Sequence, residues 1–245
     1  MKEDYTLDIF FNGKLKVYQK KRGYRFAIDA FIIANFVQLK KGQIVVELGT
    51  GCGIIALLLA LKYPEVKKII AIEIQSSLAL LARKNVSLNR FDNLIEVMEI
   101  DMKKLPQIFP AASCDVVVSN PPYYSLKKGR ISPEIEKAIA RHEIKASLED
   151  IVKIGQFVLK EKGKLYLIYP ASRCQHLFIT LRSHGLEPKC LRFVHPYVSE
   201  EANFVMVEAM KGGKEGLKVK FPLIIYERHG KYTPEVAGYY KKEGG

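Results

Sequence analysis

An asparagine, two prolines and a tyrosine follow one apolar segment, and this order of residue types could hold a flat amino group. Residues 114–119 are predicted to form a buried strand, and Asn120 and Pro121 come directly after it. Pro122 excludes Pro121 from the helical region, so the segment is extended and the Pro121 carbonyl has a fixed direction. The side-chain oxygen of Asn120 can point alongside that carbonyl, while Tyr123 offers a ring face to a planar base.

Two acceptors side by side can take both hydrogens of an exocyclic amine, which is a poor nucleophile because its lone pair is delocalised into the ring. Holding both N–H groups favours a pyramidal nitrogen and frees the lone pair for attack. Catalysis would come from orientation and from acceptors placed where positive charge develops, so no general base is needed before attack. The predicted catalytic residues are therefore Asn120, Pro121 and Tyr123.

A glycine-rich turn earlier in the chain predicts a nucleoside cofactor. Gly49, Gly51 and Gly53 lie between a predicted strand and a predicted helix, where glycines allow a sharp turn and a close approach of a ligand. Glu73 ends the next predicted strand twenty residues after Gly53, and a carboxylate at that place can accept both hydroxyls of a ribose. Asp101 ends the third predicted strand, beside the same crevice.

The spacing of this turn favours S-adenosylmethionine over a dinucleotide. The glycines follow the pattern G-x-G-x-G rather than G-x-G-x-x-G, and Glu47 precedes the first of them. A carboxylate there would repel a pyrophosphate but would suit a cationic ligand. S-adenosylmethionine carries a sulfonium and an ammonium group and no phosphate.

The elements that must position these residues alternate between strand and helix. The predicted strands are 44–48, 67–74, 94–101, 114–119 and 164–170, and the predicted helices are 28–39, a segment that Pro64 ends, 75–89, 147–160 and 171–185. Strands at 189–196 and 202–213 follow with no helix between them. This order predicts an α/β doubly wound seven-stranded sheet, mostly parallel with an antiparallel terminal hairpin.

The length of 245 residues suits one domain with a full core. We expect residues 1–43 to form a basic N-terminal segment and a covering helix, and residues 44–213 to form the catalytic core. Residues 214–245 are interpreted as a C-terminal tail made of an edge strand and a capping turn.

The charge balance favours a polyanionic partner. The chain has 39 Lys and Arg residues against 26 Asp and Glu residues, a net charge of +13, and such an excess suits phosphate contacts. Residues 14–25 carry six positive charges and no negative one, and Lys127, Lys128 and Arg130 follow the proline motif. A solvated lysine-rich surface is the alternative interpretation.

Other classes of protein are disfavoured by the cysteines, the histidines and the start of the chain. The four cysteines lie far apart and the five histidines are scattered, so no zinc spacing occurs and we predict no metal. No apolar run reaches membrane-spanning length, and acidic residues stand where a signal peptide carries positive charge. We therefore expect a cytoplasmic protein without a membrane partner, and the sequence leaves its oligomeric state open.

The glycine turn, the acid that ends the second strand and the NPPY segment together resemble class I S-adenosylmethionine-dependent methyltransferases that act on amino groups. This resemblance implies that the three glycines face the methionine end of the cofactor and that Glu73 takes the ribose. It implies that Asp101 takes the adenine amino group, with Met102 beside the ring. It also implies a seventh strand inserted antiparallel between the fifth and the sixth.

A more particular resemblance covers nearly the whole chain. The sequence is similar to the bacterial family that methylates N6 of the adenosine just 3′ of the anticodon in a valine tRNA. Three segments carry this similarity: 13–36, 139–143 and 191–236. The resemblance implies that Arg25 and Phe26 lie against the cofactor and that residues 124–142 lie over the substrate. From their charge and their place beside the proline motif, we predict that Lys127, Lys128 and Arg130 contact RNA.

The residues alone leave several amine substrates open. Glutamine-amide methyltransferases of release factors also carry NPPY, but they have a helical domain before the glycine turn, whereas only 43 residues precede the first core strand here. Adenine-specific DNA methyltransferases usually have a target-recognition domain, for which no stretch is long enough, so no DNA partner is expected. The basic clusters favour tRNA, in which a loop base is already partly unstacked. An rRNA guanine-N2 methyltransferase, a protein-glutamine N5 methyltransferase and a noncatalytic RNA-binding module remain as alternatives.

Overall fold

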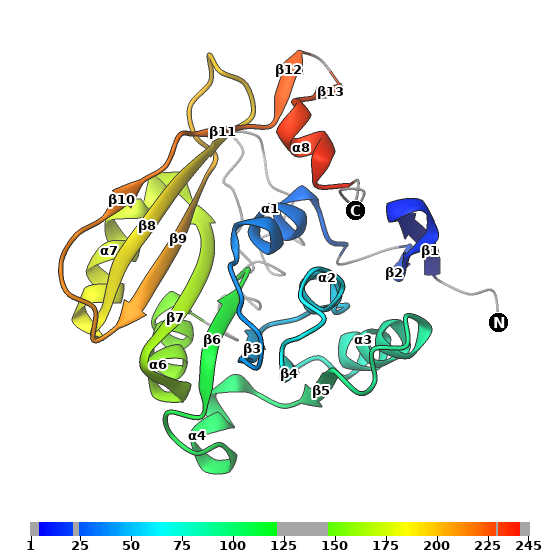
Figure 1. Ribbon diagram of the computed structural model, residues 1–245, viewed down its shortest axis with the longest axis horizontal. Coiled ribbons are helices and arrows are strands. Elements are labelled where there is room, and N and C mark those ends of the chain that lie inside the picture. The colour runs from blue at the N-terminus through cyan, green and yellow to red at the C-terminus, as the bar shows by residue number, and fades with distance from the viewer. Residues whose placement is uncertain (1–4, 22–24, 122–146, 229, 241–245) are drawn as a thin grey trace, which may run out of the picture.

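The computed structural model describes residues 5–21, 25–121, 147–228 and 230–240. A mixed sheet forms its middle layer, and helices cover both faces of the sheet (Figure 1). Tyr123, Lys127, Lys128 and Arg130 lie outside the described residues, as does the segment 124–142. None of the described helices is long and apolar enough to cross a membrane.

The strand order confirms the predicted doubly wound sheet. From one edge to the other the order is β10, β8, β9, β7, β6, β3, β4, β5, and β11 also pairs with β8. The parallel strands of the centre are β3 (Ile44–Leu48), β4 (Lys68–Glu73), β5 (Ile95–Glu99), β6 (Cys114–Ser119) and β7 (Leu159–Pro170). The last long strand, β9 (Phe204–Lys211), lies antiparallel between β7 and β8 (Leu186–His195), as the resemblance implies.

The sheet is wider than predicted because the C-terminal tail extends it. Short strands β10 (Lys218–Val219) and β11 (Leu223–Ile224) pair with β8, and both run parallel to it. The chain then forms the hairpin of β12 (Tyr226–Arg228) and β13 (Lys231–Tyr232) and the short helix α8 (Pro234–Gly238). The edge strand expected in this tail is therefore present, together with a hairpin and a helix that the sequence pattern did not predict.

Two apolar cores hold the helices to the sheet, because successive side chains of a strand point to opposite faces. On β6, Val116 and Val118 belong to one core and Val117 belongs to the other. The first core includes α1 (Ile28–Phe36), α2 (Ile54–Lys62) and α3 (Ser76–Leu88), and the second includes α4 (Leu105–Ile108), α6 (Leu148–Val158) and α7 (Cys174–Ser183). The predicted helix 147–160 is observed as α6, and Ser147 and Asp150 form a reciprocal capping box at its start.

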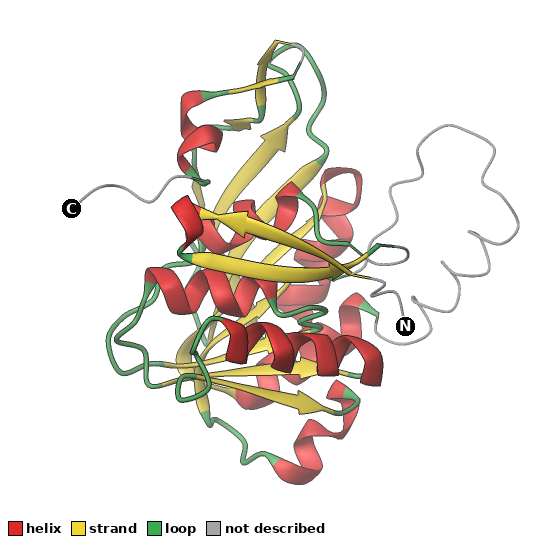
Figure 2. Ribbon diagram, turned by 90° about the vertical axis from the view of Figure 1, so that its right-hand side faces the viewer, coloured by secondary structure: helices red, strands yellow, loops and turns green. Residues whose placement is uncertain are grey.

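The basic N-terminal segment forms an antiparallel hairpin, which the sequence analysis did not predict. Its strands are β1 (Tyr5–Phe10) and β2 (Leu15–Lys20), joined by the 3₁₀ turn η1 (Phe11–Gly13). Leu15 and Val17 are fully buried in the first core, so alternate residues of β2 face the interior at the period of a strand. Figure 2 looks onto the side of the molecule that carries this hairpin.

Two asparagines of α3 attach the hairpin to the rest of the fold. The Asn85 amide donates to the Tyr18 carbonyl (3.0 Å) and accepts from its N–H (2.7 Å), so it pairs with β2 as a neighbouring strand would. Asn89 repeats the arrangement with the carbonyl and N–H of Lys16. Asn85 also donates to the carbonyl of Cys52 (2.9 Å), which links hairpin, helix and glycine turn through one buried side chain.

Candidate active site

The turn between β3 and α2 is braced by a buried carboxyl group. Glu47 is 1% exposed, and its Oε2 accepts from the Thr50 hydroxyl (2.7 Å) and the Ala56 N–H (2.9 Å). Burial raises the pKa of Glu47 to about 8; the two hydrogen bonds lower it and the Glu73 charge raises it further. The side chain thus ties the strand end to the first turn of the helix, and its predicted role toward a cationic ligand stays a prediction.

We expect the pKa of Glu47 to make the stability of the ligand-free protein fall with rising pH. The folded form keeps the proton up to about pH 8, whereas a glutamate of ordinary pKa 4.5 releases it earlier in the unfolded chain. The stability from this group is therefore complete below about pH 4.5 and is lost as the pH rises toward 8, by on the order of 2–4 kcal/mol. Denaturant unfolding at pH 5 and pH 8 measures this difference, which should shrink in Glu47→Gln. An identical pH dependence in both proteins would contradict the assignment.

Glycine is favoured in this turn for two different physical reasons, a positive φ and the space around the missing side chain. Gly49 has a φ of +78°, is exposed, and would carry a Cβ with nothing within 4 Å, so a ligand can approach its backbone. Gly53 has a φ of +88°, and a Cβ there would lie 3.3 Å from the Cβ of Ala82 on α3. Gly51 also has a positive φ, +60°. All three positions therefore favour glycine, and Gly49 combines this with open space.

Glu73 joins the end of β4 to the glycine turn. Its Oε2 accepts from the Gly51 N–H (2.9 Å) and its Oε1 accepts from the Gln75 N–H (2.8 Å). A carboxylate offers about four lone-pair positions, so two acceptor positions remain beyond these bonds. The two backbone groups fix the plane of the carboxylate, which suits recognition of a pair of hydroxyls.

Asp101 and Met102 come to the same edge of the sheet. The Ile100 N–H donates to the Glu73 carbonyl (2.9 Å), so the chain that leaves β5 stays beside the end of β4. Asp101 then caps the 3₁₀ turn η2 (Met102–Lys104) by accepting from the Lys103 N–H (3.0 Å). Met102 packs half-buried against the second core. The structure thus brings together Glu73, Asp101 and Met102 beside the glycine turn.

Asn120 is held beside the end of β3. Ser119 pairs in register with Leu48, and its buried hydroxyl donates to the Leu48 carbonyl (2.8 Å). Leu48 directly precedes the glycine turn, so the pairing of Ser119 with Leu48 places Asn120 next to that turn. The following residue, Pro121, is buried.

The two ends of the Asn120 amide have different surroundings. Its Nδ2 donates to Oδ2 of Asp29 at 3.0 Å. Its Oδ1 is buried and has no hydrogen-bond partner within the described parts of the chain. A buried carbonyl oxygen without a partner is costly, so this atom fits a site that takes a donor from a ligand.

Asp29 was not predicted as a site residue. It lies in the first turn of α1, which is a common place for a carboxylate and gives no signal of a site. Its contact with Asn120 joins residues 91 positions apart. No local pattern signals such a contact, because it depends on how α1 packs over the end of β6.

Arg25 and Phe26 lie just before α1 and are attached to the hairpin by hydrogen bonds. The Arg25 guanidinium donates to the Thr6 hydroxyl (2.9 Å) and to the Lys20 carbonyl (3.0 Å). The Phe26 N–H donates to the side-chain oxygen of Gln19 (3.0 Å), and its ring packs against Phe31 and Phe10. Their predicted contact with a cofactor stays a prediction, as do the roles of Tyr123, Lys127, Lys128 and Arg130.

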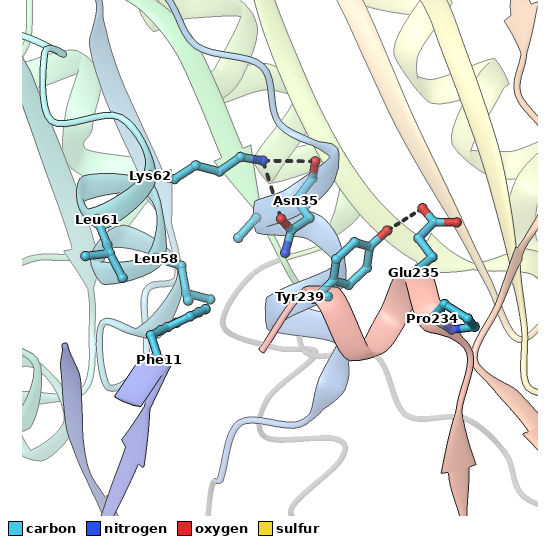
Figure 3. A pocket seen from close by; sticks show the side chains of 10 residues that line it. Phe11, Asn35, Leu58, Leu61, Lys62, Pro234, Glu235 and Tyr239 are labelled. Carbon is cyan, nitrogen blue, oxygen red and sulfur yellow. Dashed lines mark hydrogen bonds between the residues drawn. The ribbon is translucent and has the colours of Figure 1, made fainter. Parts of the chain in front are cut away.

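A groove of about 700 Å³ lies elsewhere, between η1, α1, α2 and α8 (Figure 3). Its polar groups are already engaged: Lys62 donates to Asn35, and the Tyr239 hydroxyl donates to Glu235 (2.8 Å). None of the predicted site residues lines it. Within the described ranges, no three His, Cys, Asp or Glu side chains gather as metal ligands.

Comparison with known proteins gives three kinds of match. The family model described as methyltransferase small domain matches residues 28–174. Curated proteins called tRNA1(Val) (adenine(37)-N6)-methyltransferase are similar over most of the chain. One from Parabacteroides distasonis is 27% identical over 91% of this chain and 91% of the relative, and one from Porphyromonas gingivalis is 29% identical over 77% and 74%.

Solved structures share the fold. A protein of Agrobacterium tumefaciens, described as a predicted O-methyltransferase, matches with a TM-score of 0.69 and 21% identity over 86% of this chain and 94% of that chain. The protein TYW2 of M. jannaschii, solved in complex with AdoMet, matches with a TM-score of 0.59 and 15% identity over 86% and 87%. At these identities the likeness concerns the fold.

Proposed function

This chain belongs to the methyltransferase small domain family, and we propose that it transfers the methyl group of S-adenosylmethionine to N6 of an adenosine in tRNA. The observation that carries the amine chemistry is the buried, unpartnered Oδ1 of Asn120 at the edge of the sheet, judged among the described residues. The names of the similar curated proteins support tRNA, and the anticodon-loop adenosine of a valine tRNA, as the substrate. A tRNA substrate would place the protein in the cytoplasm.

In the proposed reaction the main task of the protein is to orient the substrate amine toward the methyl group. S-adenosylmethionine supplies a methyl group on a positively charged sulfur. In our proposal Asn120 Oδ1 and the Pro121 carbonyl accept the two hydrogens of the substrate amine, while Tyr123 stacks on the base. The amino nitrogen bonds to the methyl carbon as the carbon–sulfur bond breaks, and the nitrogen carries positive charge until one proton leaves. Fixed acceptors stabilise that charge without having to reorganise.

We propose that the cofactor lies along the ends of β3, β4 and β5. Gly49 gives the backbone an open face toward the methionine end, and the oriented carboxylate of Glu73 would take the ribose hydroxyls. Asp101 would take the adenine amino group, with Met102 beside the ring. The open space at Gly49 and the free acceptor capacity of Glu73 support this arrangement.

Glu73→Ala is expected to raise the dissociation constant for S-adenosylmethionine at least tenfold, because two charge-assisted hydrogen bonds to the ribose disappear. Isothermal titration calorimetry measures this change. The control is Glu99→Gln, since Glu99 lies in register with Glu73 on the next strand and its carboxylate is bound to Ser76. Equal affinities in wild type and Glu73→Ala would remove Glu73 from the ribose site.

We propose that the basic hairpin and α3 grip the RNA backbone. Lys16 and Lys20 stand on β2, where Lys20 donates to Ser77 of α3 (2.8 Å). The ammonium of Lys84 lies 4.1 Å from the ring centre of Tyr18, which holds this charge against the hairpin. Tyrosine rings and lysines side by side suit a nucleic acid, because they can meet both phosphates and bases.

Replacing Lys16, Lys20 and Lys84 together by alanine should raise the KM for tRNA more than it lowers kcat. The salt dependence of tRNA binding should flatten by up to about 0.9 in the log–log slope for each phosphate that is no longer neutralised by a lysine. A triple control, Lys41→Ala, Lys67→Ala and Lys153→Ala, removes the same charge from exposed sites before β3 and β4 and on α6. Equal slopes for the two triple variants would separate the hairpin from RNA binding. The same effect of neutralising Lys127, Lys128 and Arg130 stays a prediction.

The proposal is tested by incubating the protein with labelled S-adenosylmethionine and total tRNA, digesting the RNA and identifying the labelled nucleoside. We expect N6-methyladenosine, and we expect the same nucleoside to be missing from a valine tRNA of cells that lack the protein. Label in methylguanosine of ribosomal RNA, or in a protein glutamine, would overturn the substrate. RNA binding without any methyl transfer would indicate a noncatalytic module.

We also propose that residues 1–245 form one domain. Strands β10 and β11 of the tail join the same sheet as β8, and Val236 of α8 is fully buried in the first core. These contacts support a tail that folds with the core rather than as a separate unit.

A further inference from the structure

The side-chain amide of Asn120 has one acceptor end and one donor end of nearly the same shape, so some other group must decide which end faces the substrate. Asp29 is placed to do this, because its carboxylate oxygen accepts from Nδ2 of Asn120 at 3.0 Å. An ionised carboxylate has no hydrogen to donate, so it excludes the reversed amide. We propose that Asp29 is a positioning residue that turns the Asn120 oxygen toward the substrate amine, an inference that rests on the function proposed above.

Asp29 is itself held firmly. Its other oxygen, Oδ1, accepts from the Ala30 N–H (3.0 Å) in the first turn of α1. The helix behind it is buried, and Ala30 and Phe31 are each 1% exposed. The Phe31 ring lies 4.5 Å from that of Tyr240 and 5.1 Å from that of Phe10, so the hairpin and the C-terminal segment clamp the helix from two sides.

The carboxylate also strengthens the acceptor. A charge-assisted hydrogen bond to the NH₂ end of an amide pushes electron density toward its oxygen, because linked hydrogen bonds polarise one another. The Asn120 oxygen then meets the amine nitrogen at the moment when that nitrogen becomes positive. Asp29 thus places a negative charge one amide away from the developing positive charge. Its field also reaches Tyr240, whose pKa is raised mainly by burial and in addition by nearby Tyr232 and Asp29.

The substitution Asp29→Asn removes the negative charge of residue 29 and its control over the Asn120 orientation, but it keeps the size of the side chain. The new amide has the same volume, but it can donate to the Asn120 oxygen and so permits the reversed orientation. We expect the single-turnover rate of methyl transfer to tRNA to fall 10- to 100-fold, while the dissociation constants for S-adenosylmethionine and tRNA change less than threefold. Asp29→Ser, whose side chain is too short to bridge to Asn120, should lower the rate by a similar factor and serves as the second variant.

The decisive experiment measures the rate of methyl transfer when Asp29→Asn is combined with Asn120→Ala. If Asp29 acts through Asn120, Asp29→Asn should change the residual rate less than twofold in the Asn120→Ala background. Glu149→Gln is the matched control, because Glu149 is a first-turn acid of α6 whose carboxylate pairs with Lys153 (3.0 Å). Glu149→Gln should leave the rate unchanged. This result would show that the rate loss in Asp29→Asn does not arise merely from removing an acid from the first turn of a helix.

A spectroscopic readout is independent of activity. The side-chain NH₂ signal of Asn120 in ¹⁵N-labelled protein should carry the downfield proton shift of a bond to a carboxylate and should lose it in Asp29→Asn. An unshifted signal in wild type, an unchanged rate in Asp29→Asn, or an equal rate loss in both backgrounds would overturn the proposal. A wild type that transfers no methyl group to tRNA would instead overturn the proposed function, and the amide signal would still decide whether Asp29 holds Asn120.

Discussion

Asn120→Ala is expected to lower the rate of methyl transfer by a factor of about 10²–10³ while the affinity for S-adenosylmethionine changes less than threefold. Removal of one aimed transition-state hydrogen bond has effects of this size. The amide oxygen is buried and unpartnered among the described residues, so it makes its hydrogen bond only when a donor arrives. The effect should therefore appear in kcat rather than in cofactor binding.

Single-turnover kinetics with labelled cofactor and tRNA measure this rate, and calorimetry measures the cofactor affinity. Asn35→Ala is the matched control, because Asn35 stands at the other end of α1 and its amide donates to the Phe31 carbonyl (2.9 Å). It should retain the full rate. A parallel loss of rate and cofactor affinity in Asn120→Ala would show a collapsed site instead of a missing acceptor.

Asn85→Ala is expected to have the largest effect on stability, about 4 kcal/mol. The side chain is fully buried and makes hydrogen bonds to the N–H and carbonyl of Tyr18 and to the carbonyl of Cys52. Truncation leaves these backbone groups unpaired, and each such buried group costs about 1–3 kcal/mol. For a chain of this length 4 kcal/mol lowers the Tm by roughly 8–16 °C.

Asn89→Ala provides the comparison, because Asn89 makes the same pair of bonds to Lys16 at a more exposed position. Water can replace those bonds, so the expected cost is about 1 kcal/mol. Calorimetric unfolding measures both variants. Equal Tm values for the two variants would contradict the assignment of Asn85 as the buried attachment of the hairpin.

The local pattern predicted the elements of the core because each of them carries its own signal. The strand Cys114–Ser119 was predicted with its observed bounds, and the helix predicted over 147–160 is observed as Leu148–Val158. An apolar run and a periodic spacing of apolar residues depend on neighbouring residues alone. The N-terminal hairpin was missed although Leu15 and Val17 alternate with polar residues. The six positive charges of residues 14–25, a range that includes β2, favoured an RNA-binding interpretation of this segment. The attachment of the hairpin depends on Asn85 and Asn89, which lie about seventy residues further along the chain.

The sequence by itself determined the seven long strands of the sheet and the helices that alternate with them, the glycine turn with Glu73 behind it, and the Asn-Pro-Pro-Tyr segment after the fourth core strand. These features follow from backbone sterics and from periodic burial, which act over a few residues. Only the tertiary structure decided which way the Asn120 amide faces and which oxygens of Glu47 and Glu73 are already engaged. Hydrogen bonds such as that from Asn120 to Asp29 join residues 91 positions apart. They form because α1 packs over the end of β6, and no short stretch of sequence encodes that packing.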